Sequence, residues 1–252
     1  QLVTTNITDY SYWRYNYTPT GNWTYVDIPW SSFAKPSWGQ GAALQLTDIL
    51  QHVRTIQFAI SDGTGGTANN TGNNWYIDQI EIYSAGTPTN TATPTQTYTG
   101  TQPPTNTSTN TQPATNTPTV TNTTAIGPMF DDFEDGEFDL NNWGGLWTQW
   151  AATGSNVTRV VTTDVPAGGG SYAGHISGDV IGSGWPSIAV SADLNASGTE
   201  MDLSSTQGIR LYMKGNKGTG TAVDFLIQLV TTNITDYSYW RYNYTPTGNW
   251  TY

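Results

Sequence analysis

The sequence predicts an all-β protein, an antiparallel β-sandwich of the jelly-roll kind. Aromatic residues make up 13% of the 252 residues, charged residues only 11%, and 27 glycines accompany many threonines and asparagines. Aromatic and β-branched side chains favour strands, whereas glycine and asparagine favour the turns between them. Short alternating apolar and polar stretches, each bounded by turn residues, recur along the chain, and such a series is typical of a sandwich.

Nine stretches are expected to form strands because apolar residues alternate within them. In 208–214, Ile209, Leu211 and Met213 share one face, and the residues between them share the other. The expected strands are 156–162, 172–177, 187–192, 208–214, 222–231, 237–244, 24–28, 54–61 and 75–83. One short helix is expected over 47–53, with Thr47 as its N-cap.

The chain contains its own beginning twice, because residues 1–25 recur without a change as residues 228–252. The offset between the two copies is 227 residues. A fixed period of identical sequence is typical of repeat architectures. One β-sandwich cannot accommodate both copies in the same position.

A segment of different composition, 86–126, lies between the two halves of the period. Residues 87–125 carry 18 threonines and 6 prolines and no charged residue. Such a stretch buries too little apolar surface to offset its ordering entropy, so we expect a linker. We also expect the linker to be ordered in an assembly, by packing on modules or by glycans. The expected glycosylation sites are Thr89, Thr91, Thr107, Thr117, Asn106 and Asn122.

The linker and the duplication together predict that the chain is divided in the middle of a domain. Residues 1–85 read as the C-terminal part of one module, and 127–252 as the N-terminal part of the next, identical one. A complete module would run from 127 to 227 and then from 1 to 85. A tandem array, separate subunits that complete one another by strand exchange, and an engineered circular permutant all fit this pattern.

Four motifs carry a resemblance to a known family. The chain reads FDDFEDG and NNWGGLW after residue 129, IRLYMKG at 209–215, YVDIPWSSF at 25–33 and NWYIDQIEIY at 74–83. These motifs resemble the galactose-binding-like jelly-roll carbohydrate-binding modules, particularly those of family 11. The Thr/Pro/Asn linker is similar to spacers of exported, surface-displayed bacterial proteins. The resemblance implies a jelly-roll fold and an extracellular or cell-surface location.

Six acidic residues lie between 131 and 139, a density of hard oxygen ligands that suits Ca²⁺. The resemblance implies a structural calcium between the first residues of the module and its last strand. Its expected ligands are Asp132, Glu134 and Asp78. The alternative is a solvated acidic turn without a metal.

Sugar binding needs exposed aromatic faces beside groups that hydrogen-bond to hydroxyls. Trp240, Tyr242 and Tyr244 alternate with Tyr239 and Arg241, so the two sets face opposite sides of a strand. If Trp240 and Tyr242 are buried in the core, Tyr239 and Arg241 point to the concave face where members of the family bind their ligand. The other carbohydrate-binding candidates are Tyr12 and Arg14 in the duplicate, with Trp38 and Trp185 in Gly-rich loops.

Charge and composition exclude several classes of function. Eight basic residues against 19 acidic ones, a net charge of -11, offer no footprint for nucleic acid or an anionic membrane. No apolar run approaches the roughly 18 residues that span a bilayer, and any export signal or anchor is expected outside this segment. The chain has no cysteine, two histidines and no G-x-S-x-G or H-E-x-x-H motif. We therefore expect no enzymatic activity.

Two hypotheses of function remain. The first is a non-catalytic repeat module of a secreted or cell-surface protein that assembles into an extended, glycosylated fibre, with neighbouring copies of itself as partners. The second is a carbohydrate-binding module that tethers an enzyme or a cell to polysaccharide.

Overall fold

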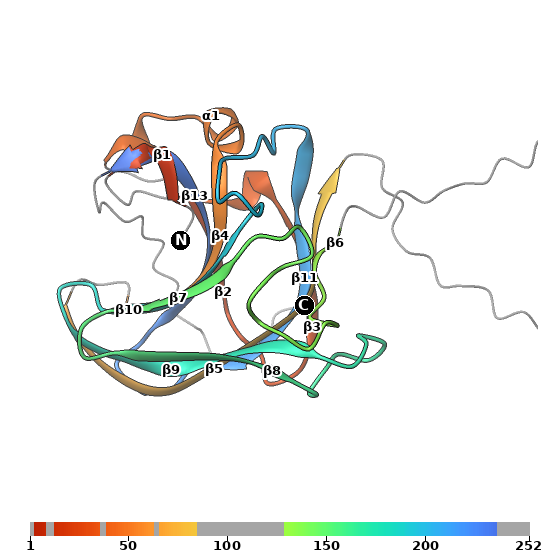
Figure 1. Ribbon diagram of the computed structural model, residues 1–252. Helices are drawn as coiled ribbons and strands as arrows, with labels where there is room; N and C mark the ends of the chain where they lie inside the picture. Colours follow the sequence, from red (N-terminus) through yellow and green to blue (C-terminus); the bar gives the residue numbers. More distant parts are fainter. Residues whose placement is uncertain (1–2, 9–12, 36–38, 63–65, 85–128, 236–252) are drawn as a thin grey trace, which may run out of the picture.

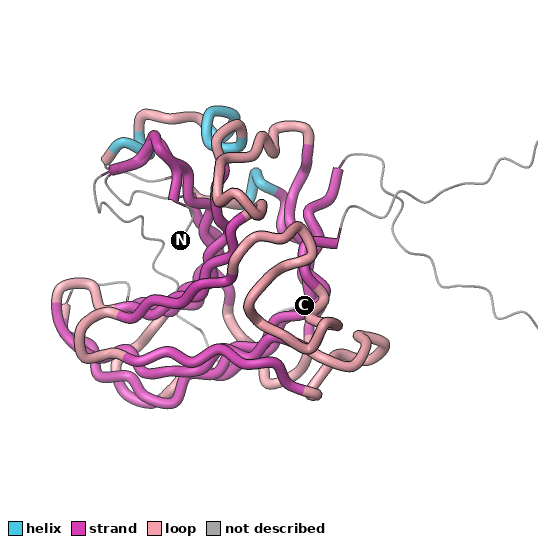
Figure 2. Tube along the Cα trace, in the orientation of Figure 1, coloured by secondary structure: helices cyan, strands magenta, loops and turns pink. Residues whose placement is uncertain are grey.

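The computed structural model describes residues 3–8, 13–35, 39–62, 66–84 and 129–235, and the side chains of residues 3–8, 13 and 232–235 are outside this description. The regular structure of its described part is mostly strands joined by loops, with one short α-helix and two single-turn helices (Figures 1 and 2). The strands form two sheets, one of six strands and one of seven. The fold is therefore an all-β sandwich of mostly antiparallel strands.

The six-stranded sheet has the order β1-β13-β4-β10-β7, and β2 also pairs with β13. Its strands are β1 (Val3–Thr8), β2 (Trp13–Tyr17), β4 (Val53–Ser61), β7 (Trp147–Ala151), β10 (Ser187–Asp193) and β13 (Asp224–Thr235). All of these pairs are antiparallel except that of β1 with β13, which is parallel.

The seven-stranded sheet has the order β3-β11-β5-β9-β8, with β6 and β12 also paired to β5. Its strands are β3 (Thr24–Pro29), β5 (Thr67–Ser84), β6 (Met129–Asp131), β8 (Asn156–Thr162), β9 (Ala173–Ser183), β11 (Thr206–Asn216) and β12 (Thr219–Gly220). The helices are η1 (Trp30–Ser32), η2 (Gln40–Ala42) and α1 (Leu46–Leu50). Segments on both sides of the linker thus contribute strands to both sheets.

Aromatic side chains fill the space between the two sheets. Trp75 of β5 meets Phe58 of β4 and Phe225 of β13 edge to face, with ring centroids 5.4 and 5.1 Å apart. Trp147 of β7 packs against Phe138 at 4.9 Å. Edge-to-face pairs of this kind add to the free energy gained from burying apolar area. The core thereby joins residues from the first and last thirds of the chain.

Most expected strands are confirmed, and the differences have local causes. The helix covers Leu46–Leu50 rather than 47–53, and its N-cap is Gln45, not Thr47, because Gln45 and Asp48 form a reciprocal capping box. Strand β5 begins at Thr67, well before the expected start. The strands β1, β2, β6, β7 and β12 are not among the expected ones, and the expected strand 237–244 lies outside the described residues. None of the described helices has the length and apolarity needed to span a membrane.

Candidate functional site

The duplicated segment meets its own copy on β13. Residues 228–235 of this strand are the second copy of residues 1–8. Strand β1 runs parallel to them and pairs residues with their duplicates, as in Asn6 with Asn233 and Ile7 with Ile234. The register shifts elsewhere along this pair, so only part of the two copies is exactly aligned.

Strand β2 occupies the same edge of β13, nearer to its start. It pairs antiparallel with residues 225–229, from Phe225 opposite Tyr17 to Leu229 opposite Trp13. Tyr17 is buried, its ring stacks on Trp75 at 6.1 Å, and its hydroxyl donates to the carbonyl of Met213 at 3.2 Å. Residues 240–244 have the same sequence as β2. Among the described strands one position on β13 is filled by this five-residue sequence, and the chain carries the sequence twice.

Two of the three expected calcium ligands approach one glycine turn. A Cβ atom added at Gly169 would lie 2.8 Å from Oδ2 of Asp78, and one at Gly170 would lie 2.3 Å from Oε1 of Glu134. Asp78 is fully buried, and its Oδ2 has no hydrogen-bond partner among the described residues. The third expected ligand, Asp132, accepts a hydrogen bond from the side-chain amide of Asn142 at 3.1 Å.

Burial dominates the electrostatics of this acidic cluster. The pKa of Asp78 is raised to about 7, mainly by desolvation and also by repulsion from Glu134, Asp132 and Asp131, against the hydrogen bond that the backbone amide of Gln79 donates to it. Burial also raises the pKa of Asp131 to about 7, against the hydrogen bonds that Phe133 and Trp147 donate to it. The pKa of Glu134 is lowered instead, because the backbone amides of Tyr172 and Ser171 donate to it.

The residues around Asp78 fit a hard cation only in part. An unpartnered, buried carboxylate oxygen is the kind of atom that Ca²⁺ would satisfy. However, across the described residues no three acidic, histidine or cysteine side chains lie close enough together to hold a metal. Glu134 already binds two amides. Backbone carbonyls or water would have to complete the coordination.

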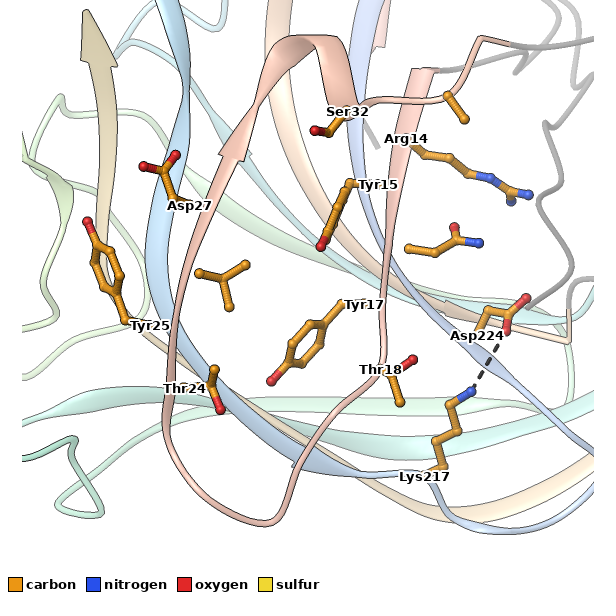
Figure 3. Close-up of a pocket in the computed structure, with 13 residues that line it drawn as sticks. Arg14, Tyr15, Tyr17, Thr18, Thr24, Tyr25, Asp27, Ser32, Lys217 and Asp224 are labelled. Carbon is orange, nitrogen blue, oxygen red and sulfur yellow. Dashed lines mark ion pairs between the residues drawn. The ribbon is translucent and has the colours of Figure 1, made fainter. Parts of the chain in front are cut away.

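A cavity of about 680 Å³ opens between β2 and β3 (Figure 3). These strands are edges of different sheets, and the backbone amide of Ala34 donates to the carbonyl of Arg14 at 2.8 Å, which closes the gap at one end. Tyr15 and Tyr17 lie in the gap, while Tyr25 and Asp27 flank β3 on its other side (Figure 3). The volume is typical of ligand sites.

Of the expected carbohydrate-binding residues, the structure describes Arg14 and Trp185. Arg14 is buried, lines this cavity and pairs across the sheet with Gln228. Trp185 lies between β9 and β10, is 38% exposed and has a positive φ of 71°. Tyr12, Trp38, Tyr239 and Arg241 lie outside the described residues, as do the linker and its expected glycosylation sites.

Sequence reasoning did not identify the cavity residues Tyr15, Tyr17, Tyr25 and Asp27 as a group. The alternation of residues along each strand indicates which face of the strand a side chain occupies. It does not indicate that the edge strands β2 and β3 are separated by a cavity. The YVDIP motif pointed to this region, because it contains Tyr25 and Asp27 in β3.

Comparison with known proteins finds no family model, curated protein or solved structure that matches this chain. The resemblance of its motifs to carbohydrate-binding modules therefore stays a prediction.

Proposed function

We propose that this chain is a non-catalytic repeat module of a secreted or cell-surface protein, in which β-sandwiches and Thr/Pro linkers alternate to form an extended fibre. Each sandwich would be a jelly roll whose sequence runs from 127 through the duplicated segment and on to the equivalent of residue 85. The observation that carries the proposal is that, among the described strands, one position on β13 is filled by a sequence that the chain contains twice.

The number of strands distinguishes a covalent array from separate subunits. Each 252-residue chain brings two copies of the β2 sequence and one β13 to pair with them. If separate chains exchanged these strands, each chain would still keep one copy of the β2 sequence with no β13 to pair with, because every partner chain also brings two copies and one β13. In an array with a 227-residue period, each β13 meets one such strand. The duplication therefore favours the array over strand exchange.

The proposed module boundaries can be tested by joining residues 127–252 directly to residues 26–84. We expect this continuous sequence to fold cooperatively as a monomer, with a free energy of unfolding at least equal to that of the 252-residue chain. Chains of several periods should appear as strings of evenly spaced beads in electron micrographs. The array would be contradicted if the continuous sequence shows no cooperative unfolding transition in urea. It would also be contradicted if 252-residue chains polymerise by themselves.

Calcium would have a structural role in this module. Asp78, Asp132 and Glu134 would hold the ion, which would join β5 to the segment after β6. We expect Ca²⁺ to raise the melting temperature, and Asp78→Asn to remove that increase. Asp202→Asn is the matched control, because Asp202 is a solvent-exposed carboxylate whose Oδ1 accepts from Ser204. An equal response of both variants would refute the site.

Carbohydrate binding is the second candidate function, and a row of polar residues favours it. Arg14, Gln228, Gln57, Ser191 and Thr148 stand opposite one another across five strands, on the side of the six-stranded sheet away from the core. Trp150 lies on the same side of β7 and is 51% exposed, whereas Arg14, Gln57 and Gln228 are buried. Retardation in polysaccharide gels that Trp150→Ala removes would support this function, and no retardation would exclude it.

A further inference from the structure

We propose that the end of β5 and strand β6 form a mechanical clasp, which opens when the linkers are under tension and lets the fibre lengthen. This inference rests on the proposed array, in which each linker would transmit tension from one module to the next. The clasp consists of residues 80–84 of β5 and residues 129–131 of β6.

The chain leaves the sandwich and enters it again at neighbouring positions. Strand β5 ends at Ser84 and β6 begins at Met129, and the linker lies between these two residues in the sequence. The two strands are antiparallel, with Glu81 opposite Met129 and Ile80 opposite Asp131. In an array, both linkers of a module would therefore be attached at the same end of one strand pair.

This arrangement decides how tension acts on the two strands. Hydrogen bonds between antiparallel strands run perpendicular to the strands. Linkers that pull Ser84 and Met129 apart would therefore pull along these bonds and open them one at a time. If the linkers were attached at opposite ends of the pair, tension would run along the strands and load all of the bonds together.

Strand β6 is held less firmly than β5. At this end of the sandwich β5 also pairs with β11, where Ser84 lies opposite Thr206. Its residues Ile80 and Ile82 are buried in the core. Strand β6 has three residues and, among the described strands, pairs only with β5. Tension would therefore detach β6 and leave β5 in its sheet.

Buried aromatic rings resist the opening of the clasp and favour its closure. Phe130, Phe133 and Phe138 are buried, and their ring centroids lie 6.3, 6.0 and 4.9 Å from that of Trp147. Trp147 begins β7, which β10 holds in the other sheet. Detachment of β6 would release the chain as far as β7, residues 129–146, and extend it by about 60 Å. Return of the three rings to the core would close the clasp when the tension falls.

The clasp can be tested in the 252-residue chain with optical tweezers, because the chain has no cysteine and two introduced thiols are unique handles. One variant carries Thr87→Cys and Gly127→Cys, at the two ends of the linker, and loads the pair from one end. The linker between these handles spans about 130 Å when extended, so it permits the expected step. The matched control keeps Gly127→Cys and moves the other handle to Thr67→Cys, at the exposed start of β5, so that the force runs along the strands.

We expect the linker handles to give a first step of about 60 Å. The control should need about twice the force, because it loads both register pairs of β5 and β6 together. Phe130→Ala should lower the force measured with the linker handles, whereas Leu140→Ala, at an exposed residue of the same segment, should leave it unchanged.

Equal forces for the two pairs of handles, or a first step far from 60 Å with the linker handles, would overturn the clasp. The array is tested separately by the continuous sequence of residues 127–252 and 26–84. Failure of the clasp and failure of the array are therefore distinguishable.

Discussion

Replacing Tyr17 with alanine tests which copy of the duplicated segment pairs with β13. Tyr17 is 8% exposed, stacks on Trp75 and donates a hydrogen bond to Met213. Truncation of a buried aromatic side chain costs about 3 to 5 kcal/mol, and loss of the hydrogen bond contributes about 1 kcal/mol within that range. We expect Tyr17→Ala to lower the free energy of unfolding by about 4 kcal/mol.

The duplication supplies an internal control for this substitution. Tyr244 is the counterpart of Tyr17 in the second copy. If strand β2 is the segment that pairs with β13, Tyr244→Ala changes the free energy of unfolding by less than about 0.5 kcal/mol. The double variant then has the same stability as Tyr17→Ala.

Urea titration followed by tryptophan fluorescence measures these differences, because Trp75 lies against Tyr17 and reports on its loss. The slope of the transition should stay constant across the variants, since the area exposed on unfolding changes little. The opposite pattern would refute the assignment: near-wild-type stability for Tyr17→Ala, and a loss of about 4 kcal/mol only in the double variant. That result would show that the second copy takes the position whenever the first is damaged.

Two further predictions concern a buried acid and a buried glycine. Burial raises the pKa of Asp131 to about 7, above its unfolded value near 3.8, so the native state binds the proton more tightly. In EDTA, the stability from this group is therefore complete below pH 4 and is lost as the pH rises through 7, by up to about 4 kcal/mol. Urea titrations across this range should show the decline, and Asp131→Asn should reduce it without removing it, because the pKa of Asp78 is also raised to about 7. A Cβ atom at Gly145 would lie 1.8 Å from the carbonyl oxygen of Asp193, so Gly145→Ala should cost more than about 3 kcal/mol. Gly184→Ala, where φ is positive but no atom lies within 4 Å, should cost only about 1 to 2 kcal/mol in the same assay.

The fold class was predictable because the central strands alternate clearly. Strand β11 places Ile209, Leu211 and Met213 in the core, as its sequence indicates. The first half of β5, TANNTGNN, carries no such pattern. Backbone pairing with β9 and β12 holds it instead, together with side-chain amides that donate to main-chain carbonyls, as Asn73 does to Gly178 and Asn70 to Thr221. A pattern of hydrophobic residues cannot predict a strand stabilised in this way.

The approach of two expected calcium ligands was predictable from the family resemblance, whereas calcium binding itself stays a prediction. The resemblance named Asp78 with Glu134, and the structure brings both side chains to the turn at Gly169 and Gly170. The cavity between β2 and β3 was not predictable, because its existence depends on how far two sheets separate at their edges. That separation is set by packing across the whole core, not by the residues of either strand.

The proposed array also explains why one chain holds two segments suited to one position. Residues 240–244 follow the pairing segment 225–229 after ten residues, 230–239, so closure of this short loop would give them a high effective concentration at the edge of β13. Strand β2 has a different advantage, because it continues directly into β3, which the second sheet holds in place. In a 252-residue chain, these two advantages belong to different copies. In a chain of repeated periods, the segment that follows β13 along the chain also continues into β3. The short connection to β13 and the anchoring by β3 therefore favour pairing of the same segment.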